Sequence, residues 1–163
     1  MIKYVPQDTS VTFAEIPTEI TLCLNLSLCP HHCPGCHSQY LQADIGDELT
    51  EQIIDELLVR HKGITCILFM GGDGDKERLS QLAAYAKSKG ILSGWYSGED
   101  QLDISNYSSA FDYIKVGSYK KEYGPLNSPT TNQRLYKLTK DSIEDITHIF
   151  HKINEKINYE TSR

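Results

Sequence analysis

Apolar and polar residues alternate strictly along the segment ITLCLNLSL, residues 20–28. Apolar side chains occupy positions 20, 22, 24, 26 and 28, and small or polar side chains occupy the positions between them. A period of two residues predicts a β-strand with two different faces. We expect the apolar face to pack against helices and the small, polar face to line a working interior.

The segment LTEQIIDELLVRHK, residues 49–62, has the apolar spacing of an amphipathic helix instead. Thr50 is the predicted N-cap, and Leu49 with Ile54 forms a predicted hydrophobic staple around it. Gly63 is expected to end the helix because glycine readily adopts the left-handed conformation of a C-terminal cap.

The rest of the chain continues this alternation of strands and helices. A nearly continuous apolar run predicts a buried parallel strand over residues 64–70, and further strands are predicted over residues 91–96 and 111–116. A helix-like spacing predicts helices over residues 75–89, ended by a glycine, and over residues 141–154. This order predicts parallel strands that are joined by right-handed crossovers.

The carboxyl ends of parallel strands meet at one edge of a sheet, where the active sites of α/β folds lie. Four segments are expected at that edge: a cysteine-rich loop after residues 20–28, GGDGD (71–75), SGED (97–100) and GSYKKEYG (117–124). A complete eight-unit β/α barrel takes about 250 residues. The 163-residue chain is therefore predicted to be α/β, a single domain over residues 1–163 that forms a partial, open β/α barrel with mostly parallel strands.

Composition and charge narrow the classes of function. Hydrophobic residues make up 39% of the chain and charged residues 23%, as in ordinary globular proteins. The net charge of −6 argues against unaided binding to nucleic acid or to an anionic membrane. No apolar run has the length of a membrane span, and the N-terminal segment lacks an apolar signal core, so we expect a cytoplasmic protein.

Three of the five cysteines lie in the segment CPHHCPGCH, residues 29–37. Cys29, Cys33 and Cys36 have the spacing C-x3-C-x2-C, and Pro30 and Pro34 favour a loop because each lacks an N–H. In a reducing compartment, such a group is more often a metal or redox site than a structural disulfide.

The residues themselves leave several kinds of centre open. Structural zinc usually takes four protein ligands, and a histidine of the loop (His31, His32 or His37) could be the fourth. A redox disulfide within CPGC would leave the remaining cysteine without a role. Soft thiolates also suit iron–sulfur clusters, and a [4Fe-4S] cluster on three cysteines would keep one iron free of protein ligands.

The segment CPHHCPGC resembles the cluster motif of radical S-adenosylmethionine (radical SAM) enzymes, and its CPGC part resembles the activating proteins of anaerobic (class III) ribonucleotide reductases. MGGDGD (70–75) is similar to the glycine-glycine-acid segment of these enzymes, and KVGSYKKEY with SPTTNQRLYKL resembles a second signature of the subgroup. The resemblance covers nearly the whole chain. Two positions depart from it: Asp73 stands where the family usually has Glu, and Ser38 where many relatives have Asn.

The resemblance implies an enzyme that reductively cleaves S-adenosylmethionine at a [4Fe-4S] cluster. The radical would be passed to a glycine of the large subunit of anaerobic ribonucleoside-triphosphate reductase, with a flavodoxin or ferredoxin as electron donor. The implied metal ligands are Cys29, Cys33 and Cys36, with no catalytic residue beyond them. The implied cofactor contacts are Gly71, Gly72, Asp73, Ser97 and Gly98.

Other functions fit parts of the same pattern. The chain could activate another glycyl-radical enzyme or act on a small metabolite, and a non-catalytic zinc-binding module is the alternative from another class. GGDGD also fits a plain tight turn before a helix, and SGED fits a plain turn equally well. The roles of Lys115, Asn132, Gln133 and Arg134 stay open at this point.

Overall fold

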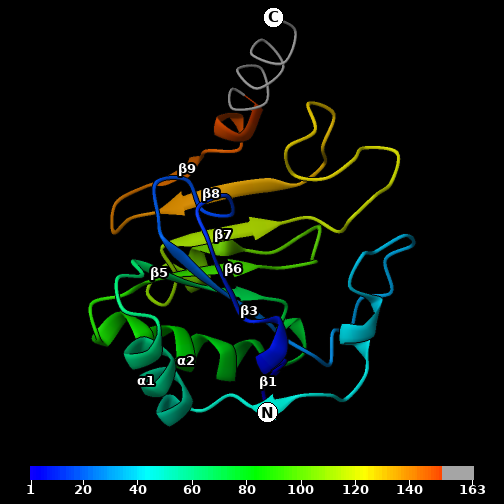
Figure 1. Ribbon diagram of the computed structural model, residues 1–163. Helices are drawn as coiled ribbons and strands as arrows, with labels where there is room; N and C mark the ends of the chain where they lie inside the picture. Colours follow the sequence, from blue (N-terminus) through cyan, green and yellow to red (C-terminus); the bar gives the residue numbers. More distant parts are fainter. Residues whose placement is uncertain (152–163) are drawn as a thin grey trace, which may run out of the picture.

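The fold is built on a seven-stranded mixed sheet in a computed structural model that describes residues 1–151 (Figure 1). Its strands, in spatial order, are β2 (Ser10–Thr12), β3 (Thr21–Asn25), β5 (Cys66–Met70), β6 (Leu92–Tyr96), β7 (Tyr113–Val116), β8 (Arg134–Leu138) and β9 (Ile143–Asp145). A separate antiparallel pair joins β1 (Lys3–Tyr4) to β4 (Asp47–Glu48). Short 3-10 turns span Pro6–Asp8, Gln39–Gln42, Asp73–Asp75 and Ile104–Tyr107.

The four central strands, β3, β5, β6 and β7, are parallel and follow one another in chain order. Antiparallel strands flank them on both sides, because β2 pairs with β3 and β8 pairs with β7. The parallel centre positions four loops at one edge, as the alternation of elements predicts. Whether this sheet is a partial barrel of the radical SAM type stays a prediction.

Two helices, α1 (Glu51–Arg60) and α2 (Lys76–Ser88), cover one face of the sheet (Figure 1). The predicted cap is confirmed, since the Thr50 hydroxyl accepts a hydrogen bond from the Ile53 N–H at 3.3 Å. Leu49 and Ile54 are fully buried in the same apolar cluster, as expected of a hydrophobic staple. No helix within residues 1–151 is long and apolar enough to cross a membrane.

The opposite face of the sheet differs from the prediction made for residues 20–28. A second apolar cluster buries Cys23 together with Ile16, Cys66 and Leu68, so this face of β3 is mostly core. Residues 13–19 cross over it, where the Glu15 carbonyl accepts a hydrogen bond from a β6 tyrosine at 2.5 Å. The small side chains therefore make room for a covering segment, and only the end of the strand reaches a cavity.

The helix predicted over residues 141–154 is wrong for its first half. Residues Ile143–Asp145 form β9, which pairs antiparallel with β8, and helical backbone begins only at residue 148. The turn before β9 is held by the Thr139 N–H, which donates to the Ser142 carbonyl at 2.9 Å. Pairing with β8 thus overrides a helix-like spacing of isoleucines, and residues 152–154 lie outside the described residues.

Candidate metal and cofactor site

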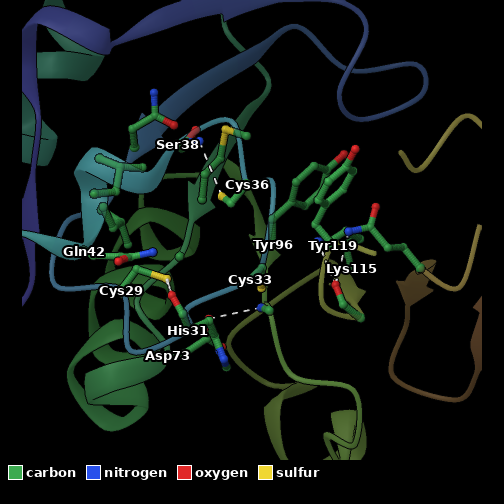
Figure 2. Close-up of a pocket in the computed structure, with 18 residues that line it drawn as sticks. Cys29, His31, Cys33, Cys36, Ser38, Gln42, Asp73, Tyr96, Lys115 and Tyr119 are labelled. Atoms are coloured by element: carbon green, nitrogen blue, oxygen red, sulfur yellow. Dashed lines mark hydrogen bonds and ion pairs between the residues drawn. The ribbon is translucent and has the colours of Figure 1, made fainter. Parts of the chain in front are cut away.

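A cavity opens at the carboxyl ends of the four parallel strands (Figure 2). It encloses about 760 Å³ of empty space, part of it open to solvent. Its lining comes from every loop that was expected at this edge, with Cys29, Cys33 and Cys36 after β3, Gly71 and Asp73 after β5, Gly98 after β6, and Gly117 and Tyr119 after β7. The topology therefore gathers residues that lie up to 108 positions apart in the sequence, from Asn25 to Gln133.

The cysteine loop places three free, half-buried thiols against this cavity. The loop is pinned at its start, where the Cys29 N–H donates to the Leu41 carbonyl at 3.0 Å, and it turns where the Cys36 N–H donates to the Cys33 carbonyl at 3.2 Å. Gly35 has a positive φ of 76°, which suits glycine at this turn. Residues 29–37 thus form a loop with neither helix nor strand, as the two prolines predict.

The surroundings of Cys29 and Cys36 act on their thiol groups. Burial raises the pKa of Cys29, and the nearby Asp73 and the other two cysteines raise it further. The Ser38 N–H donates to the Cys36 sulfur at 3.4 Å, which helps to orient that side chain. A bound metal deprotonates its thiol ligands outright, so metal binding would overcome the raised pKa of Cys29.

The kind of donor at this cavity bears on the centre that it could hold. Within residues 1–151, no three histidine, cysteine or carboxylate side chains come close enough together to hold one metal ion. A polynuclear cluster binds each cysteine through a different iron atom, so its ligands stand further apart. Three soft thiolates around one cavity are a donor set for an iron–sulfur centre.

A comparison with known protein families matches residues 20–116 to the 4Fe-4S single cluster domain. The match covers more than half of the chain and contains the four parallel strands and the cysteine loop. The chain belongs to this family. Comparisons with curated proteins and with solved structures returned no match. The 4Fe-4S single cluster domain thus bears out the iron–sulfur prediction at the level of cluster type.

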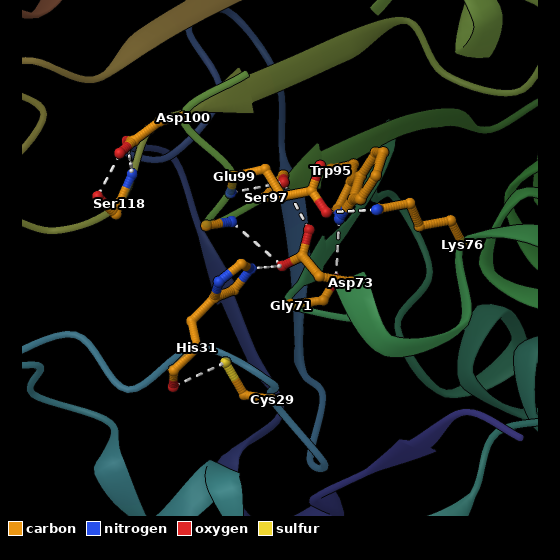
Figure 3. Close-up of polar contacts among 12 residues, drawn as sticks. Cys29, His31, Gly71, Asp73, Lys76, Trp95, Ser97, Glu99, Asp100 and Ser118 are labelled. Carbon is orange, nitrogen blue, oxygen red and sulfur yellow. Dashed lines mark hydrogen bonds and ion pairs between the residues drawn. The ribbon is translucent and has the colours of Figure 1, made fainter. Parts of the chain in front are cut away.

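In this 4Fe-4S domain, Asp73 lies in the cavity wall and contacts several neighbouring residues, and its side chain is only 1% exposed. One carboxylate oxygen accepts from the Ser97 hydroxyl at 2.5 Å, and the other accepts from the Gly98 N–H at 3.1 Å (Figure 3). The His31 Nε2 atom lies 3.2 Å from that second oxygen. Asp73 therefore joins the loops that follow β3, β5 and β6.

The position of His31 in the site was not predicted in detail, since the loop histidines were interpreted as a possible fourth zinc ligand or as solvated or supporting groups around the centre. Its ring lies so close to Gly98 that a Cβ there would come within 2.5 Å of the His31 Cδ2 atom. The signal in the sequence is the glycine after Ser97, which leaves space for a ring above it. The contact itself depends on folding, because 67 positions separate His31 from Gly98.

The predicted cofactor contacts divide into two groups. Gly71, Asp73 and Gly98 line the cavity, whereas Gly72 and Ser97 lie behind its wall. A Cβ on Gly72 would come within 2.9 Å of a leucine side chain of α2, so this glycine serves close packing at a positive φ of 89°. The Gly71 carbonyl accepts a hydrogen bond from the indole of Trp95 at 2.9 Å, which fixes the turn after β5.

Lys115, whose role the sequence left open, extends from β7 into the cavity and is only 9% exposed. Its ammonium donates to the Gly117 carbonyl at 3.3 Å and lies 5.4 Å from the centre of the Tyr96 ring. Burial lowers the pKa of Lys115 to about 8, although Asp73 and the cysteines Cys33 and Cys36 act in the opposite direction. The cavity therefore contains one buried anion and one buried cation.

The segment after β7 completes the rim. Gln133 lines the cavity and donates from its amide to the Gly117 carbonyl at 3.2 Å, while the Asn132 amide donates to the Ser118 carbonyl at 3.0 Å. The Arg134 guanidinium donates to the Thr131 and Gln133 carbonyls, both at 2.8 Å. Of the three polar residues in NQR, only the glutamine contacts the cavity, and the other two shape the loop.

Proposed function

We propose that this 4Fe-4S domain is a radical SAM enzyme that holds its cluster through Cys29, Cys33 and Cys36. The observation that carries the proposal is the number of thiols at the cavity. The other two cysteines, Cys23 and Cys66, are buried in the sheet core, and burial raises the pKa of Cys23 to about 12. Three available thiols leave one iron of a four-iron cluster without a cysteine ligand.

The space beside the cysteines supports binding of a cofactor as well as a cluster. The cavity combines apolar side chains, such as Leu26, Leu41 and Met70, with a few polar groups, as is typical of small-molecule sites. Gly71 and Gly98 expose backbone on one wall, and Asp73 supplies a negative charge suited to an ammonium group. S-adenosylmethionine carries such an ammonium group, and its amino and carboxylate groups can chelate an iron that lacks a protein ligand.

When bound, the cluster supplies the electron that splits the sulfonium bond of S-adenosylmethionine, which releases methionine and an adenosyl radical for hydrogen-atom abstraction. The residues of this chain place and protect the reactants. Asp73 holds the loops around Gly98 and His31 in one arrangement. Tyr119 lies 3.7 Å from where a Gly35 Cβ would stand and close to the His37 ring, so it covers the cysteine loop from the β7 side.

We propose as substrate a glycine of the large subunit of anaerobic ribonucleoside-triphosphate reductase, with a flavodoxin or ferredoxin as electron donor. The support is the resemblance of the segments around Gly117 and Gln133, which lie at the rim of the cavity. A partner that offers a glycine to the cavity would meet this rim.

Anaerobic reconstitution with iron and sulfide tests the reaction. We expect the reduced protein to convert S-adenosylmethionine to methionine and 5′-deoxyadenosine, measured by chromatography. Cys29→Ala should abolish the conversion, while the matched control Cys23→Ala should keep it because Cys23 lies in the core. Equal loss in both variants would contradict the ligand assignment, and a colourless protein with one zinc would contradict the radical reaction altogether.

A second experiment tests the substrate. The reduced protein is mixed with S-adenosylmethionine and the large reductase subunit, and electron paramagnetic resonance reports on a glycyl radical. A radical signal that depends on Cys29 supports the reductase as partner. Cofactor cleavage without any radical on the reductase would assign the enzyme to another glycyl-radical partner or to a small metabolite.

A further inference from the structure

Lys115 is a buried cation whose hydrogen-bonding capacity is largely unused. An ammonium group has three donors, and the structure gives it one protein acceptor, the Gly117 carbonyl, at 3.3 Å. That carbonyl also accepts from the Gln133 amide at 3.2 Å, so the single acceptor is shared. No carboxylate lies within ion-pair distance of Lys115 in the part of the chain that the structure describes.

Other basic side chains that are partly buried have carboxylate partners. Lys87 pairs with Asp112 at 3.0 Å, Arg78 pairs with Glu51 at 2.6 Å, and Lys76 pairs with Glu99. Lys115 is buried more deeply than any of these three and has no such partner. Burying an ammonium without an anion is costly, so the position calls for a negative charge that the folded chain alone does not provide.

The cavity supplies that negative charge once a cluster is in place. Cys33 and Cys36 line the same cavity as Lys115, and both are near enough to influence its charge (Figure 2). Each bound cysteine is a thiolate, and reduction of a cluster adds a further electron to the same small volume. A nearby cation in a low-dielectric cavity favours that added charge.

We propose that Lys115 is the counter-ion of the cluster and that its positive charge makes reduction of the cluster more favourable. Lys115 does not touch reacting atoms; it acts through its charge on the electron-accepting centre. The inference rests on the proposed cluster ligands Cys29, Cys33 and Cys36. It does not rest on cleavage of S-adenosylmethionine, because the counter-ion is needed as soon as the cluster accepts an electron.

The test compares reduction potentials of reconstituted proteins in the absence of S-adenosylmethionine. Lys115→Met removes the charge at similar length, Lys115→Arg keeps it, and Lys137→Met removes an exposed lysine on β8 as a matched control. A redox titration followed by electron paramagnetic resonance gives the midpoint potential. We expect Lys115→Met to make reduction at least tenfold less favourable, a negative shift of about 59 mV for one electron. Lys115→Arg and Lys137→Met should stay close to the parent protein.

Iron and sulfide content separates the possible outcomes. Loss of the cluster from Lys115→Met but not from Lys115→Arg supports the proposal. Both variants replace the lysine by another long side chain, but only arginine keeps the positive charge. An unchanged midpoint potential in fully loaded Lys115→Met overturns it, and so does equal loss of the cluster from both variants, which would indicate a packing role. If Lys115→Met shifts the midpoint potential as expected but the parent protein cleaves no S-adenosylmethionine, only the proposed reaction is contradicted.

Discussion

Asp73 and Lys115 are two buried charges in one cavity, 7% and 9% exposed, yet the protein treats them differently. Asp73 has both carboxylate oxygens occupied by hydrogen bonds from the loop after β6, and His31 lies beside one of them. Lys115 has one shared carbonyl. Equal burial therefore does not imply equal function.

The difference separates a charge that already has partners within the fold from a charge that has almost none. A buried carboxylate with several donors is stable by itself and fixes the loops that it joins. A buried ammonium with one shared acceptor is unfavourable until an anion arrives. Without the cluster, Asp73 should therefore stabilise the folded chain, and the positive charge of Lys115 should destabilise it.

The largest effect is expected from Asp73→Asn. The new amide would turn an N–H toward the donors that now meet a carboxylate, so buried donors lose acceptors. We expect the free energy of unfolding of the cluster-free chain to fall by about 1 to 3 kcal/mol, measured by urea denaturation. Asp103→Asn is the control, because Asp103 accepts two hydrogen bonds from Ser105 at an exposed position. Equal losses would show that burial of Asp73 is irrelevant.

Lys115→Met should act in the opposite direction on the cluster-free chain. Burial lowers the pKa of Lys115 from 10.5 to about 8, so the charged form destabilises the folded state. Near neutral pH, we expect the free energy of unfolding of the variant to exceed that of the parent by about 1 to 3 kcal/mol. The advantage should shrink as the pH rises from about 8 toward 10.5, since the folded parent then sheds the proton that its unfolded chain retains.

The sign of this result decides whether the comparison holds. Urea denaturation of both proteins at pH 7 and at pH 10 gives the difference directly, and other titrating groups cancel because both proteins share them. A cluster-free Lys115→Met that is less stable than the parent would mean that Lys115 is satisfied within the fold.

A smaller effect should follow from removing the ring beside Asp73. His31→Ala leaves the carboxylate with the two hydrogen bonds from the loop after β6, so we expect a loss of about 1 kcal/mol or less in urea denaturation. His32→Ala is the neighbouring control, since His32 is exposed and forms a hydrogen bond of 2.8 Å with Gln42, away from Asp73. A larger loss of stability from His32→Ala than from His31→Ala would show that the contact between His31 and Asp73 does not stabilise the fold.

The smallest change in stability is expected for Glu51, whose hydrogen bonds are about as short as those of Asp73 but lie near solvent. Arg78 donates to both oxygens of Glu51, at 2.6 and 2.8 Å, and these bonds lower the pKa of Glu51 to about 2. Both side chains are partly exposed, so Glu51→Gln should cost less than about 1 kcal/mol in unfolding. The parent's advantage should be present above pH 4.5 and vanish as the pH falls through about 2. A loss as large as that of Asp73→Asn would contradict the importance of burial.

Local signals in the sequence were sufficient for the centre of the fold. The cap at Thr50 and the apolar run that becomes β5 act within a few residues, so their structures follow from their own segments. The site edge could be predicted for a related reason: parallel strands in chain order place the following loops together, and the spacing of Cys29, Cys33 and Cys36 is itself local.

The remaining features depend on partners distant in the sequence. Strand β9 exists because β8 offers it an edge, which no periodicity within residues 141–154 reveals. The contact between His31 and Asp73 joins two loops, and neither loop alone predicts it. The burial of Lys115 follows from Tyr96 and the rim around Gly117, and the segment that contains Lys115 does not reveal these contacts.

Mössbauer spectroscopy of protein reconstituted with ⁵⁷Fe tests the three-cysteine centre most directly. If Cys29, Cys33 and Cys36 leave one iron open, one of the four iron sites should change its spectrum when S-adenosylmethionine is added, while the other three stay alike. The same addition should leave the spectrum of a variant lacking Cys29 without that specific change. Four iron sites that remain equivalent with and without S-adenosylmethionine would contradict the proposed centre.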